Sequence, residues 1–184
     1  MEREKLAGAV KSIAWGYVLL HVNINFGTLN VLPNWLGYVL MMGALPILGK
    51  EEPSALLLRP LGILLALWEG LLWGLTIFNI PFDSTIVSIL GSAASLYFHF
   101  QLLTNLASLA QRYNCPEERK ILKLRTVRTL LITLLALPFN WQQYSVVSVC
   151  VVFAHIIVAL WICSVLFSLR WSLLETDLPK AEES

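Results

Sequence analysis

Four ionisable side chains lie inside long apolar stretches of the sequence: His21, Glu69, His99 and His155. Imidazole titrates near neutral pH, so histidines beside a carboxylate can bind and pass protons. A charge inside a bilayer costs at least about 2.5 kcal/mol, so such groups face the protein interior or water. We therefore predict a ligand or proton site at the middle of a membrane around Glu69, His99 and His155, with His21 and Asn25 close to it.

Two other interpretations fit the same residues. Polar side chains also hold membrane helices together through hydrogen bonds, each worth about 0.6 kcal/mol. Two imidazoles and a carboxylate suit zinc, iron or copper, and His99 with His155 would suit a haem. The sequence has neither a His-x-x-x-His nor a His-Glu-x-x-His motif. We therefore predict no cofactor, and whether a metal binds stays open.

The composition indicates the elements that must position these residues. Of the 184 residues, 57% are hydrophobic and 14% are charged. A soluble domain of this size could not bury so much apolar surface, so we predict an all-α, polytopic integral membrane helix bundle in a lipid bilayer. The net charge of +1 provides no basic field for nucleic acid, and no glycine-rich phosphate loop is present. We expect neither nucleic acid nor a nucleotide among its partners.

Six apolar segments predict six transmembrane helices. They cover approximately residues 8–28, 32–48, 55–78, 84–110, 121–138 and 143–169. We assign residues 1–170 to one transmembrane domain and 171–184 to a polar cytoplasmic tail, and we identify no signal peptide. Lys123, Arg125 and Arg128 interrupt the fifth segment. It spans only if these cations snorkel to the headgroups, and a re-entrant hairpin is the alternative.

The distribution of positive charge predicts the orientation. All 13 lysines and arginines lie in or next to the two tails, in or next to the connection between the second and third segments, or in and before the first half of the fifth segment. The other three connections carry none. Positive residues stay on the cytoplasmic side, so we predict that both termini are cytoplasmic. The small build with short loops favours a bacterial cytoplasmic (inner) membrane.

A ridge of small residues occurs in the third segment at four-residue steps, formed by Gly62, Ala66, Gly70 and Gly74. Such a ridge lets another helix approach closely. We predict that it packs against a helix and that a homo-oligomer could form through this face.

Two functional interpretations follow from these residues. The first is a transporter-like protein, and the alternative is a structural or partner-binding membrane subunit with no activity of its own.

A serine on the fourth segment and a histidine on the sixth are similar in order to those of rhomboid intramembrane proteases. Ser92, Ser95 and His155 occupy these places in the chain. The Gly-x-Ser-Gly turn and the long first loop of that family are absent. We therefore predict that the protein is not an enzyme, and we interpret it as a small transporter-like protein whose substrate the sequence does not reveal.

Overall fold

The computed structural model describes residues 2–21, 25–26, 29–30, 33–82, 84–136 and 145–175. Almost all of these residues are helical, so the predicted all-α fold is confirmed. A two-residue antiparallel pair, β1 (Asn25–Phe26) and β2 (Leu29–Asn30), follows the first helix. The helices are α1 (Glu2–His21), α2 (Asn34–Glu51), the short 3-10 helix η1 (Pro53–Leu57), α3 (Leu58–Ile77), α4 (Thr85–Arg112), α5 (Glu118–Ala136) and α6 (Ser145–Glu175).

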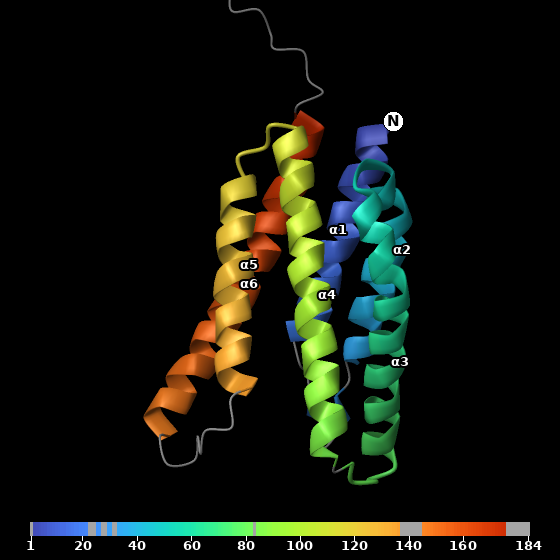
Figure 1. Cartoon of the computed structure of the whole chain (residues 1–184), viewed down its shortest axis with the longest axis vertical. Helices are drawn as coiled ribbons and strands as arrows, with labels where there is room; N and C mark the ends of the chain where they lie inside the picture. Colours follow the sequence, from blue (N-terminus) through green and yellow to red (C-terminus); the bar gives the residue numbers. More distant parts are fainter. Residues whose placement is uncertain are drawn as a thin grey trace, which may run out of the picture.

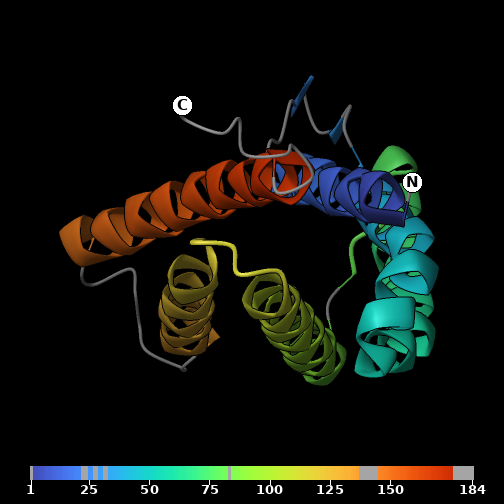
Figure 2. The same ribbon diagram turned by 90° about the horizontal axis from the view of Figure 1, so that it is seen from above.

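The six α-helices form a ring. Each helix contacts the next one in the sequence, and α6 returns to pack against α1 (Figure 1). Seen from above, α6 and α1 form one side, α2 and α3 a second, and α4 and α5 the third (Figure 2). Side chains from all six helices therefore point toward a common interior.

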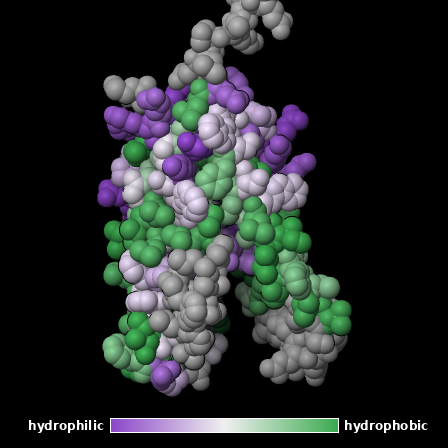
Figure 3. Space-filling view, turned by 180° about the vertical axis from the view of Figure 1, so that it is seen from behind, coloured by the Kyte–Doolittle hydropathy of each residue, from purple (hydrophilic) through white to green (hydrophobic). Residues whose placement is uncertain are grey.

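The outer surface of the ring is apolar. Large aliphatic side chains are exposed on it; Ile86 and Val146 are each 74% exposed. Hydrophilic residues gather at the end of the molecule where the chain begins (Figure 3). Within the described ranges, three helical stretches are long and apolar enough to cross a membrane: Pro53–Ile77, Thr85–Arg112 and Val149–Glu175. These features are those of a membrane protein, because an exposed apolar belt of this extent is unfavourable in water.

Two glycines let the backbones of α1 and α2 touch. A Cβ atom on Gly37 would lie 2.7 Å from the carbonyl oxygen of Gly16, and one on Gly16 would lie 2.8 Å from that of Gly37. Because the obstacle in each direction is backbone, a larger residue does not fit without separating the helices. This close crossing is not one that the sequence analysis proposed.

The ridge of small residues on α3 packs within the chain. A Cβ atom on Gly62 would lie 2.9 Å from Met42 of α2, and one on Gly70 would lie 3.8 Å from Trp35 of the same helix. At Gly74 the space within 4 Å is open. The ridge thus serves the contact between α2 and α3, and a homo-oligomer through it stays a prediction.

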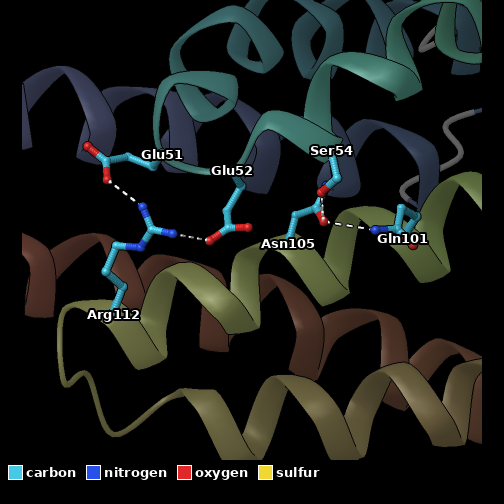
Figure 4. A network of polar contacts seen from close by, with 6 residues as sticks. All are labelled: Glu51, Glu52, Ser54, Gln101, Asn105 and Arg112. Atoms are coloured by element: carbon cyan, nitrogen blue, oxygen red, sulfur yellow. Dashed lines mark hydrogen bonds and ion pairs between the residues drawn. The ribbon is translucent and has the colours of Figure 1, made fainter.

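The hydrophilic end of the ring is closed by polar contacts. Figure 4 shows Arg112 of α4 paired with Glu51 at 3.3 Å and with Glu52 at 3.0 Å. Beside this pair, the Ser54 hydroxyl donates to Asn105 Oδ1 at 2.9 Å. Exposed ion pairs contribute at most about 1 kcal/mol each. Their role here is to hold the corner between α2 and α3 against α4.

A buried carboxylate holds the start of α5 against α6 at the same end. Glu117 is 2% exposed and accepts hydrogen bonds from Ser168 at 2.6 Å and Ser172 at 3.0 Å. Burial, and then the Glu117 carboxylate, raise the pKa of the nearby Cys115 thiol. The Cys115 thiol therefore remains protonated at neutral pH and is a poor nucleophile.

Candidate functional site

His99 lies where α1, α2 and α4 meet, and both of its ring nitrogens have partners. Its side chain is buried, with Nδ1 3.1 Å from the Tyr17 hydroxyl of α1 and Nε2 3.4 Å from the Tyr38 hydroxyl of α2. The Tyr38 hydroxyl also lies 3.0 Å from Ser95 Oγ, one turn before His99 on α4. In a neutral imidazole one nitrogen donates and the other accepts. The imidazole of His99 can therefore link two hydroxyl groups in one chain of hydrogen bonds.

The chain of polar rings continues from Tyr17 to the other two histidines. The Tyr17 ring stacks on His21, one turn later on α1, with centroids 6.0 Å apart. The His21 ring lies 5.6 Å from the His155 ring of α6. His21 Nδ1 donates to the Tyr17 carbonyl oxygen at 2.8 Å. The three histidines thus form a row across α4, α1 and α6, with Tyr17 between His99 and His21.

Glu69 lies on the wall of a pocket on the other side of His99. The pocket has a volume of about 280 Å³, and Glu69 shares its wall with Ser88, Ser92 and Ser95 of α4. These serines are three or four residues apart, so they occupy one face of the helix. Asn34 Nδ2 donates to the half-buried Glu69 carboxylate at 3.3 Å. Glu69 of α3 therefore shares one pocket with these serines, and His99 follows Ser95 by one turn of α4.

A second, more open pocket leads to the first. Its volume is about 570 Å³, and it is lined by Thr76, Asn79 and Phe82 at the turn between α3 and α4. Leu72 and Ser88 line both pockets, so the two are neighbours. Figure 3 shows the molecule hollowed at this end, between the arm formed by α5 and α6 and the other helices. Glu69 is therefore reached from the end opposite to the charged end.

The predicted site residues form a connected row. Glu69 and His99 are linked through the pocket, Ser95 and Tyr38. His155 lies beyond Tyr17 and His21, on the far side of His99. Asn25 is in β1, and its side chain falls outside the described part of the structure. The tyrosines are the residues that the sequence analysis missed as site members, although Tyr17 is one turn from His21 on the same helix face.

The described histidines and carboxylates do not converge as a metal site would. Within that part of the chain, no group of three His, Cys, Asp or Glu side chains is placed to hold an ion. Both ring nitrogens of His99 already face tyrosine hydroxyls. A metal or haem ligand at His99 would have to displace one of these hydroxyls. The arrangement is therefore suited to hydrogen bonding and proton exchange.

Arg128 does not meet the condition that the sequence analysis set for a span by the fifth segment. That condition was that Lys123, Arg125 and Arg128 snorkel to the headgroups, whereas the Arg128 side chain is only 6% exposed. Only Lys123 is exposed, while Arg125 donates to Thr104 at 2.9 Å. Arg128 follows the buried residue Leu124 by four positions, so helical spacing could have indicated that it points inward.

Comparison with known proteins leaves the function to be argued from this geometry. No family model, characterised protein or solved structure matches the chain.

Proposed function

We propose that the chain is a small six-span membrane transporter that moves protons through the interior of its helix ring. The single observation that carries this proposal is the position of Glu69, a carboxylate on an open pocket that is connected through Ser95 and Tyr38 to the buried His99. An ionisable residue inside a membrane protein usually marks an ion or proton pathway. Glu69 is the first group of the proposed pathway, on the pocket that adjoins the turn between α3 and α4.

The contacts of α5 support the view that it spans the membrane with the other five helices. Its interrupting cations are accommodated by the protein: the Arg125 guanidinium lies 4.4 Å from the centre of the Phe100 ring, and Arg128 faces inward. At 19 residues, α5 is close to the length of about 20 that a bilayer needs. The clustering of cations at the end that includes the start of α5 supports cytoplasmic termini, as in a bacterial inner membrane.

The proposed pathway uses groups that can both accept and donate a proton. Glu69 takes up a proton from water in the pocket, and the serine and Tyr38 hydroxyls relay it toward His99 by rotation. His99 accepts at one ring nitrogen and releases at the other, which exchanges its tautomer and passes the proton toward Tyr17. Because the polar end is closed, this conformation corresponds to a state in which the proposed pathway is open only at the end next to the turn between α3 and α4.

Replacing Glu69 with glutamine tests this function. Glutamine keeps an acceptor for Asn34 but cannot carry a proton, so proton flux should fall about 100-fold, as expected on loss of a proton-transfer group. The measurement is acidification of proteoliposomes that contain a trapped pH-sensitive dye, driven by a potassium diffusion potential. Glu175→Gln is the matched control, because Glu175 is exposed at the end of α6 and should leave the flux unchanged.

Two outcomes of that assay would overturn the proposal. The first is flux in the wild-type vesicles no greater than in vesicles without protein. The second is a Glu69→Gln protein that folds normally and conducts at the wild-type rate. Either result would favour a structural or partner-binding subunit, in which the same hydrogen bonds only hold the helices together.

A further inference from the structure

Arg128 is a buried cation without a counter-ion in the described part of the chain. Its Nε atom is shielded from solvent and has no hydrogen-bond partner. The ion pairs found among the described residues do not include it. Glu69, which shares the pocket wall with Ile132 of α5, accepts a hydrogen bond from Asn34. A guanidinium has five N–H donors and stays charged in proteins, so burial in this form is unfavourable.

The surroundings of Arg128 place it in the interior of the ring. Its side chain is only 6% exposed, and it follows the buried Leu124 by one turn of α5. Ile132, one turn further along the same face of α5, lines the pocket that contains Glu69. Arg128 is therefore enclosed by the protein one turn from the pocket wall, although it is not itself among the residues that line the pocket.

Arg125, on the same helix, has partners that Arg128 lacks, although the Nε atom of each arginine is buried without a hydrogen-bond partner among the described residues. It donates to Thr104 at 2.9 Å, and its guanidinium lies over the Phe100 ring. Arg128 has neither kind of contact among the described residues, although it is the more deeply buried of the two. The contrast indicates that the missing partner of Arg128 is a ligand.

We propose that the ring interior binds an oxyanion, a carboxylate or a phosphate, on the guanidinium of Arg128. The planar guanidinium matches such groups with two parallel N–H donors. An oxyanion there supplies the negative charge and the acceptors that the described protein groups do not. This oxyanion is then a transported substrate, taken up together with the proton on Glu69, and that part of the proposal rests on the proposed function. The binding itself does not.

The test compares anion binding by three proteins purified in mild detergent: wild type, Arg128→Gln and Arg119→Gln. Arg119 is exposed near the start of the same helix and serves as the matched control. Thermal unfolding is followed while acetate or inorganic phosphate is added at constant ionic strength. In a separate series, phosphatidylglycerol is compared with uncharged phosphatidylcholine. A ligand that binds the folded state raises the unfolding temperature with its concentration.

We expect at least one of these oxyanions to stabilise the wild type and Arg119→Gln alike, with the apparent Kd raised at least about tenfold in Arg128→Gln. Stabilisation by acetate or phosphate identifies a soluble ligand, and stabilisation by phosphatidylglycerol alone identifies a lipid headgroup. No stabilisation by any probe, or equal stabilisation of wild type and Arg128→Gln, overturns the proposal. The proton-flux assay requires none of these probes. A failure of the proton-transport proposal can therefore be distinguished from a failure of oxyanion binding.

Discussion

Replacing Arg128 with methionine is expected to raise the free energy of unfolding of the ligand-free protein by about 3 kcal/mol, because it removes an uncompensated buried charge. Methionine retains the unbranched shape of the side chain and fills irregular space well. The measurement is unfolding in mixed micelles of a mild detergent and sodium dodecyl sulfate. A gain of this size from the loss of a polar residue is typical of positions kept for function at the expense of stability.

Arg125→Met is the matched control for this prediction. Arg125 has a hydrogen bond to Thr104 and contact with the Phe100 ring, so its replacement should lower the free energy of unfolding by about 1 kcal/mol. The two substitutions are one turn apart on the same helix and should have opposite signs. A loss of stability in Arg128→Met would show that the guanidinium has a partner within the native protein.

Replacing His99 with leucine is expected to lower the free energy of unfolding by about 2–4 kcal/mol. Leucine is similar in volume, so the effect comes mainly from the two tyrosine hydroxyls that lose a partner in the buried interior. Tyr38 retains Ser95, whereas Tyr17 loses the one hydroxyl partner that the described residues provide. The Tyr17 hydroxyl should therefore account for most of the loss.

A double-mutant cycle isolates that contribution. Tyr17→Phe should cost much less in the His99→Leu protein than in the wild type, with a coupling energy of about 1–2 kcal/mol. His155→Leu is the control among the histidines, because the buried Nδ1 of His155 has no hydrogen-bond partner in the described structure and should cost little. Strict additivity of His99→Leu and Tyr17→Phe would contradict the hydrogen-bonded row.

The helices and the serine face could be predicted from the sequence because both depend on local spacing. Each of the six apolar segments corresponds to one of the six α-helices, and helical spacing alone places Ser88, Ser92 and Ser95 on one face of α4. Closure of the ring by α6 against α1 could not be predicted, since no local pattern records which helices meet. That closure is what brings His21 to His155.

The site and packing residues that the sequence analysis missed were missed for a common physical reason. Tyr17 and Tyr38 are aromatic residues in apolar stretches, where a hydroxyl group gives no signal of its own. Arg128 stands in a cluster of cations that the positive-inside rule already explains. Gly16 and Gly37 matter only because two backbones cross there, and the crossing point depends on the whole arrangement. Each of these roles belongs to the packed structure.

In the proposed mechanism, water reaches the pocket beside Glu69 from the end of the molecule that carries the turn between α3 and α4. The most direct measurement is the reaction of a cysteine at Ser92, in a protein without its native cysteines, with a charged thiol reagent that cannot cross membranes. Ile89→Cys is the control, because Ile89 is 61% exposed on the same helix but faces lipid in this account. We predict rapid labelling of Ser92→Cys from that side of the membrane alone, and almost none of Ile89→Cys. Labelling of Ser92→Cys from neither side, or no faster than Ile89→Cys, would contradict the account.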